Sequence, residues 1–156
     1  MAVETNAVQV GTMAPDFNLE TTTGRVNLSE YRGSQNVVLY FMRELSCMMC
    51  QRHVSQLKQL YSQLQQRGTT VLVVGGGNQQ EAQRLSSRLQ LPFPVAADTD
   101  GEVYHRYGLE KVMLFLQRSG TILIDKQGKV SYIHRVTNPG ASFDKDELLK
   151  EIDLVR

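Results

Sequence analysis

The chain is organised around one stretch, Val37-Val38-Leu39-Tyr40-Phe41-Met42-Arg43-Glu44-Leu45-Ser46-Cys47-Met48-Met49-Cys50. It starts with a continuous apolar run, which is typical of a central strand that is buried on both faces, so we expect this strand in the middle of a sheet. It ends with both cysteines of the protein, in a Cys-x-x-Cys pattern. Such a pair at a strand-to-helix junction can form and break a disulfide, because its sulfurs meet within one turn and a helix N-terminus stabilises a thiolate. The sequence therefore predicts a redox site at this junction.

After the cysteines the apolar pattern changes to a helical period. Apolar residues recur at spacings of three and four from Cys50 to Leu64, with polar residues between them. Gly68 is placed to end this helix, and Thr69 to Val74 forms a second buried-strand run. Strand, helix and strand together predict a βαβ unit with parallel strands and a right-handed crossover.

Shorter elements are predicted on both sides of this unit. A β-hairpin and a brief helical turn precede it, and a helix, a short strand, a short helix, a second hairpin and a terminal helix follow it. Before the unit we expect a hairpin over residues 11–20 and 25–28 and a turn that ends at 31. After it we expect a helix over 79–91, a strand over 95–97, a short helix over 102–107, a hairpin over 121–125 and 129–134, and a terminal helix over 144–154.

Composition indicates an ordinary folded domain. The chain has 156 residues, of which 41% are hydrophobic and 21% charged, so we expect a single domain over residues 1–156. The formal net charge is +1 and no long block of Lys and Arg occurs, which argues against a nucleic-acid partner. Neither a leader-like N-terminus nor a membrane-length apolar window is present. We therefore expect a soluble, cytoplasmic protein with no membrane partner.

Other uses of the cysteines fit the residues less well. A structural zinc site built on Cys47, Cys50 and His53 would need a fourth ligand, and no second Cys or His pair is nearby. A c-type haem site would require His where Gln51 stands. The three glycines at 75–77 match neither the P-loop nor the dinucleotide-binding pattern. We interpret them as a flexible connection between a strand and a helix. We therefore expect no metal and no cofactor, while packing of two small apolar thiols under the helix stays open as an alternative.

Motifs along nearly the whole chain resemble those of one family. They are Gly11-x-x-Ala14-Pro15-Asp16-Phe17-x-Leu19, Asn27-Leu28-Ser29-x-Tyr31-Arg32-Gly33, Phe93-Pro94-Val95-x-x-Asp98, Tyr107-Gly108-Leu109 and Ile124-Asp125-x-x-Gly128-Lys129-Val130. Their order and spacing resemble the alkyl hydroperoxide reductase/thiol-specific antioxidant (AhpC/TSA) family, which includes the peroxiredoxins. The resemblance implies an α/β protein with a thioredoxin-like fold, in which helices flank a central mixed sheet, and with an N-terminal β-hairpin extension. It also implies an antioxidant oxidoreductase.

The resemblance assigns roles to particular residues. Peroxiredoxins carry Pro-x-x-x-Thr/Ser-x-x-Cys after the central strand, and Arg43, Cys47 and Cys50 match that spacing. On this match Cys50 is the peroxidatic cysteine that attacks a hydroperoxide, and Cys47, in place of the family hydroxyl, is the resolving thiol of an intramolecular disulfide. Arg118 resembles the active-site arginine before the family's Ile-Asp strand. Arg118, Arg43 and His53 are expected to stabilise the thiolate or the substrate.

Two other functions stay open at this point. In thioredoxins the first cysteine of such a pair is the nucleophile, so a protein disulfide reductase would attack with Cys47. A redox-sensing or interaction module would form the same disulfide without turnover. The peroxidase interpretation implies a hydroperoxide substrate and an external thiol reductant such as a thioredoxin system. The oligomeric state is open, with a homodimer as one option.

Overall fold

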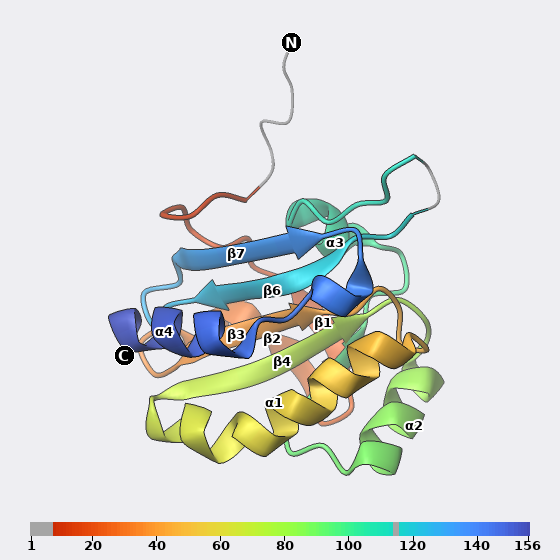
Figure 1. Ribbon diagram of the computed structural model, residues 1–156, viewed down its shortest axis with the longest axis horizontal. Coiled ribbons are helices and arrows are strands. Elements are labelled where there is room, and N and C mark those ends of the chain that lie inside the picture. Colours follow the sequence, from red (N-terminus) through yellow and green to blue (C-terminus); the bar gives the residue numbers. More distant parts are fainter. Residues whose placement is uncertain (1–7, 114–115) are drawn as a thin grey trace.

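The computed structural model describes residues 8–113 and 116–156. Among these residues the strands form one seven-stranded mixed sheet in the order β2-β1-β5-β4-β3-β6-β7, with helices on both of its faces (Figure 1). The strands are β1 (Asn18–Thr21), β2 (Gly24–Asn27), β3 (Asn36–Phe41), β4 (Thr69–Gly75), β5 (Val95–Ala97), β6 (Ser119–Ile124) and β7 (Val130–Val136). The helices are η1 (Leu28–Tyr31), α1 (Met48–Gln66), α2 (Gln79–Leu89), α3 (Glu102–Arg106), η2 (Pro139–Ala141) and α4 (Lys145–Val155).

The predicted βαβ unit forms the middle of the sheet. Strands β3 and β4 pair directly and in parallel, and α1 is the crossover that connects them. Every residue of both strands is buried. The expectation that β3 is the middle strand is wrong by one position: β3 is interior, but β4 holds the central position in the strand order. The reason is that β5 and the N-terminal hairpin add three strands beyond β4, whereas β6 and β7 add two beyond β3.

Two hydrophobic cores lie on the two faces of the sheet. Helices α1, α2 and α4 cover one face, where Tyr40 of β3 packs with Leu57 of α1 and Leu148 of α4. Helix α3 and the turn η1 cover the other face, where Phe41 packs with Tyr107. Successive side chains of a strand point to opposite faces, so β3 contributes alternately to both cores.

Both predicted hairpins are confirmed, and each lies at one edge of the sheet. Strands β1 and β2 pair at one edge, where Thr21 of β1 also pairs with Ala96 of β5. Strands β6 and β7 pair at the other edge, and β6 runs antiparallel to β3. Gly128, with φ of +87°, allows the turn between β6 and β7.

The helix boundaries follow local capping chemistry. Asn78 and Glu81 form a reciprocal capping box at the start of α2. That helix ends at Leu89, two residues before the expected end at Leu91, because Gln90 adopts a left-handed conformation with φ of 52°. No helix in the part of the chain that the structure describes combines the length and the apolar character needed to span a membrane.

Candidate active site

The cysteine loop, residues 42–47, leaves the carboxyl end of β3 and leads into α1. The amides of Met42 and Leu45 donate to carbonyls of Val74 and Gly76 at the end of β4, over 2.9 and 3.0 Å. A Cβ on Gly75 would lie 2.5 Å from Cδ2 of Leu45, so a glycine is needed for this close approach. The glycine segment that follows β4 therefore holds the cysteine loop in place.

Cys47 is the N-cap residue of α1. Its Sγ accepts a hydrogen bond from the amide of Cys50 over 3.4 Å, as a Ser or Asp oxygen does at many helix starts. The residue is 4% exposed. Its sulfur lies at the positive end of the helix dipole.

Cys50 lies in the first turn of α1 and is fully buried, with 0% exposure. Its Sγ accepts a hydrogen bond from the backbone amide of Arg43 over 3.2 Å. Burial raises the pKa of the Cys50 thiol far above its ordinary value, and the neighbouring Cys47 sulfur raises it further. The Arg43 amide, which donates to the sulfur, lowers this pKa, and the nearby Tyr40 hydroxyl lowers it less. Both cysteines are free thiols in the structure.

A polar cluster lies beneath Cys50 in an otherwise apolar core. The hydroxyl oxygen of Tyr40 is 3.0 Å from Nδ1 of His53 and 2.7 Å from Oγ of Ser142. Burial lowers the pKa of His53, which favours its neutral form. Sequence analysis included His53 but missed Tyr40 and Ser142. The strand pattern indicated that Tyr40 is buried, but no sequence signal indicated the partner of its hydroxyl.

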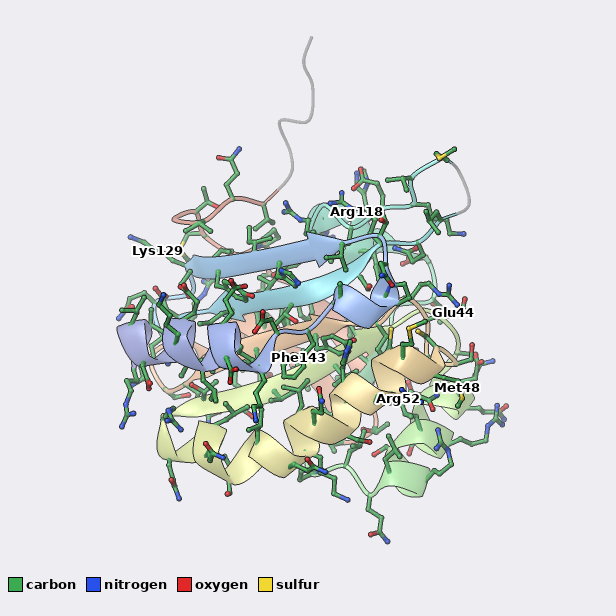
Figure 2. All side chains as sticks on the ribbon, in the orientation of Figure 1. Glu44, Met48, Arg52, Arg118, Lys129 and Phe143 are labelled. Carbon is green, nitrogen blue, oxygen red and sulfur yellow. The ribbon has the colours of Figure 1, made fainter. Side chains whose placement is uncertain are left out.

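The structure places the two predicted arginines differently. Arg43 is next to Cys50, but the contact is made by its backbone amide and not by its guanidinium. Arg118 donates from Nη1 to the carbonyl of Gly108 over 3.1 Å and lies near Arg135, whose pKa is lowered by burial and then by Arg118. In Figure 2 Arg118 is drawn apart from Met48 at the start of α1. Its role at the thiolate stays a prediction.

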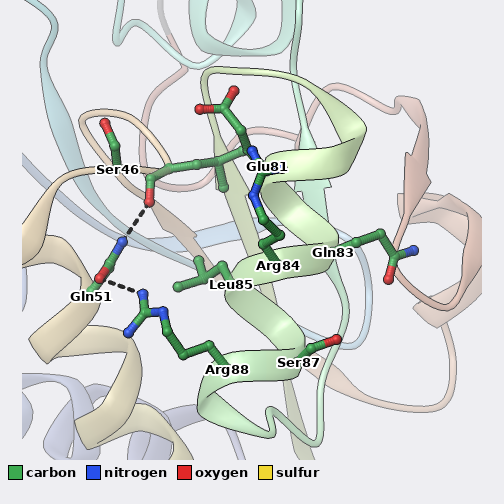
Figure 3. A pocket seen from close by; sticks show the side chains of 9 residues that line it. Ser46, Gln51, Glu81, Gln83, Arg84, Leu85, Ser87 and Arg88 are labelled. Carbon is green, nitrogen blue, oxygen red and sulfur yellow. Dashed lines mark hydrogen bonds between the residues drawn. The ribbon is translucent and has the colours of Figure 1, made fainter.

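Two grooves open on either side of the cysteine loop. The first, the α1–α2 groove, has a volume of about 730 Å³. Gln51 spans one side of it, donating to the Leu45 carbonyl and accepting from Nη2 of Arg88, both over 2.8 Å (Figure 3). The second groove, of about 530 Å³, is lined by Arg43, Glu44, Asp98 and other polar residues. Both grooves give access to the loop that carries Cys47.

The described residues 8–113 and 116–156 contain no group of three or more His, Cys, Asp or Glu side chains arranged to hold a metal ion. Asp98 instead accepts hydrogen bonds from the amides of Val103 and Tyr104 over 2.8 and 3.0 Å. The Asp98 carboxylate therefore stabilises the start of α3.

Comparison with known proteins agrees with this geometry. The family model described as "AhpC/TSA family" matches residues 10–133. The chain belongs to the AhpC/TSA family. Among its relatives, the thiol-disulfide oxidoreductase ResA of Geobacillus thermodenitrificans is 35% identical over 132 residues, which is 83% of this chain and 71% of the relative. The putative peroxiredoxin bcp of Coxiella burnetii is 29% identical over 137 residues, 81% of this chain and 88% of the relative.

Solved structures confirm the thioredoxin-like fold. The peroxidoxin BcpB of Mycobacterium tuberculosis superposes with a TM-score of 0.83 at 18% identity, covering 96% of this chain and 99% of that one. A putative thiol:disulfide interchange protein DsbE of Chlorobium tepidum has a TM-score of 0.75 at 26% identity, covering 95% and 97%. The family and its relatives identify the chain as a peroxiredoxin-like oxidoreductase enzyme.

Proposed function

We propose that the enzyme reduces hydroperoxides through a dithiol–disulfide cycle of Cys50 and Cys47. The Cys50 thiolate attacks one peroxide oxygen, the O–O bond breaks, and the products are a sulfenic acid on Cys50 and, once the leaving oxygen takes a proton, an alcohol or water. The Cys47 thiol then attacks the Cys50 sulfur, which releases water and forms the disulfide. An external thiol reductant restores both thiols.

One observation carries this proposal: both sulfurs are nearly inaccessible, with the two cysteines 4% and 0% exposed. A hydroperoxide is much smaller than a protein disulfide, so it needs less displacement of the loop to reach Cys50. The amide of Arg43 is aimed at the Cys50 sulfur and stabilises negative charge on it. Relatives named peroxiredoxins also support a peroxide substrate.

A second candidate is protein disulfide reduction with Cys47 as the nucleophile. The N-cap position of Cys47 favours it, because this sulfur lies at the end of the loop and at the positive end of the helix dipole. In this reaction Cys47 attacks one sulfur of the target, and Cys50 then attacks the mixed disulfide and releases the reduced target. The relatives named ResA support this candidate.

The reductant of the cycle is proposed to be a thiol protein that binds the α1–α2 groove through an acidic segment. Arg84 and Arg88 line this groove, and both are exposed. Its lining acid, Glu81, is held in the α2 capping box. The net positive lining therefore complements acidic side chains. A cytoplasmic location, which the sequence predicts, would supply such reducing thiols.

The test is treatment of the reduced enzyme with one equivalent of hydrogen peroxide. Mass spectrometry should detect a Cys47–Cys50 disulfide, Cys50→Ser should abolish peroxide consumption, and Cys47→Ser should stop at a Cys50 sulfenic acid that dimedone traps. Peroxide consumption that survives in Cys50→Ser would show that Cys50 is not the attacking thiol. Reduction of insulin without reduction of peroxide would establish the second candidate, and a disulfide without turnover would indicate a redox sensor.

A further inference from the structure

One peptide group connects the two faces of the sheet at the end of β3. It is the group between Met42 and Arg43, which is trans, so its carbonyl and its N–H point in opposite directions. The N–H of Arg43 donates to Sγ of Cys50, which belongs to the core on the α1 face, over 3.2 Å. The carbonyl of Met42 accepts a hydrogen bond from the hydroxyl of Tyr104, which belongs to the core on the α3 face. The peroxide cycle described above assigns no role to Tyr104.

Tyr104 is held in place by groups outside the cysteine loop. It lies on α3 and is 3% exposed. Its backbone amide donates to the buried carboxylate of Asp98 over 3.0 Å, and its ring packs edge-on against Phe41 with 5.2 Å between the ring centroids. Its hydroxyl also donates to the carbonyl of Val74 over 3.2 Å, which places it where β3 and β4 end. Burial raises the pKa of Tyr104, so the hydroxyl keeps the proton that it donates.

The hydrogen bonds between the cysteine loop and β4 involve the peptide groups on either side of this one. The amide of Met42, which belongs to the preceding peptide group, donates to the carbonyl of Val74 over 2.9 Å. The next such bond along the loop runs from the amide of Leu45 to the carbonyl of Gly76. The peptide group that faces Cys50 lies between these two bonds, and its carbonyl is held by Tyr104.

We propose that Tyr104 is a positioning residue that orients and polarises the Arg43 amide toward the sulfur of Cys50. A donor on the carbonyl fixes the plane of a peptide group and polarises it, so its N–H becomes a stronger donor in turn. Two hydrogen bonds in series therefore run from the Tyr104 hydroxyl through the peptide group to Cys50. Both strengthen when the sulfur carries negative charge, because a thiolate is a stronger acceptor than a thiol. Tyr104 thereby acts on the thiolate through the backbone.

The inference rests on the proposed function for its role in catalysis, but its first test uses no peroxide. In the reduced protein, the proton–nitrogen NMR resonance of the Arg43 amide reports its hydrogen bond to Cys50. Tyr104→Phe removes only the hydroxyl and keeps the ring against Phe41. The Arg43 amide proton should then move upfield, and its exchange with solvent should become faster by about threefold to tenfold.

Tyr107→Phe is the matched control for the loss of a buried hydroxyl. Tyr107 also packs against Phe41, and its hydroxyl also donates to a backbone carbonyl, that of Pro15 over 2.6 Å. This carbonyl lies outside the cysteine loop, so the Arg43 resonance should stay where it is in the parent. An unchanged Arg43 resonance in Tyr104→Phe, or an equal change in Tyr107→Phe, would overturn the inference.

A double-mutant cycle tests whether Tyr104 acts through the Arg43 amide. In a single turnover with hydrogen peroxide, Tyr104→Phe should slow sulfenic acid formation on Cys50 by about threefold to tenfold. Arg43→Pro lacks the amide hydrogen, so Tyr104→Phe added to it should cause no further loss. A full further loss in the double variant would contradict the inference. If the parent consumes no peroxide while the Arg43 resonance changes as expected, the proposed function fails and the positioning role of Tyr104 stands.

Discussion

Cys47 and Cys50 are separated by two residues, yet they belong to two different environments. Cys47 lies in a loop between two grooves and is stabilised by the helix start, next to Met48, which is 73% exposed. Cys50 lies on the sheet side, where the Arg43 amide donates to its sulfur. The first sulfur accepts a hydrogen bond at the start of a helix, whereas the second accepts one from the Arg43 amide inside a dry core. The pair is therefore chemically unequal before any substrate binds.

The largest expected effect comes from removing a donor on the Cys50 side. Arg43→Pro deletes the amide hydrogen that reaches the Cys50 sulfur. Hydrogen bonds to charged groups contribute about 1.5–3 kcal/mol, so sulfenic acid formation on Cys50 should slow by about tenfold to a hundredfold. Stopped-flow measurement of peroxide consumption in a single turnover tests this.

Arg43→Ala is the matched control, because it keeps the amide and removes the guanidinium. It should retain a rate within a few-fold of the parent. An alanine variant as slow as the proline variant would show that the guanidinium, as first expected from the sequence, is the effective group. Far-ultraviolet circular dichroism should show that both variants keep the fold.

The Cys47 side depends instead on how closely the loop packs on β4. Gly75→Ala places a Cβ 2.5 Å from Leu45, and such overpacking costs about 1–3 kcal/mol of unfolding free energy. Urea denaturation measures this cost. Gly76→Ala is the control, because nothing lies within 4 Å of its Cβ. In Gly75→Ala the displaced loop should speed alkylation of Cys47 more than that of Cys50, and equal acceleration would contradict the separation of the two environments.

The fold was largely predictable because its signals are local. The apolar run of β3, the helical period after Cys50 and the glycines at turns each act over a few residues. The location of the cysteine pair at the start of α1 also follows from the chain order of strand, loop and helix. Helix ends were less predictable, as at Gln90, where a left-handed residue ends α2 before the apolar pattern does.

The candidate site was predictable only where it is local in sequence. The cysteine spacing and the nearness of Arg43 were expected, but the use of the Arg43 amide in place of its side chain depends on how the loop folds back. Tyr40 and Ser142 are 102 residues apart in the sequence. They meet only because the connection from β7 to α4 packs against β3. Arg118 was assigned from its place before a strand, a pattern that does not fix where its guanidinium points.

A smaller effect is expected from changing the charge of the groove through which a partner protein reaches the Cys47 side. Replacing Arg84 and Arg88 with Glu reverses the charge of the α1–α2 groove, which should raise KM for a protein thiol reductant by about threefold to tenfold. Turnover with dithiothreitol should stay unchanged, since a small thiol needs no groove. Lys145→Glu with Lys150→Glu, on α4, makes the same charge change elsewhere. Equal effects of both pairs would show that only net charge matters.

The smallest expected effect is a pH dependence of stability that belongs to the Cys50 side. Burial lowers the pKa of His53, so between the folded and unfolded values the unfolded chain binds more protons. The stability linked to His53 is fully present above its ordinary pKa of about 6.5 and is lost as the pH falls through the lower folded value. His53→Asn should therefore lose less unfolding free energy between pH 7 and pH 5 than the parent, as measured in urea. If His53→Asn keeps the parent's full pH dependence, the imidazole below Cys50 is solvated in the folded state and does not form part of the dry environment that distinguishes this thiol from Cys47.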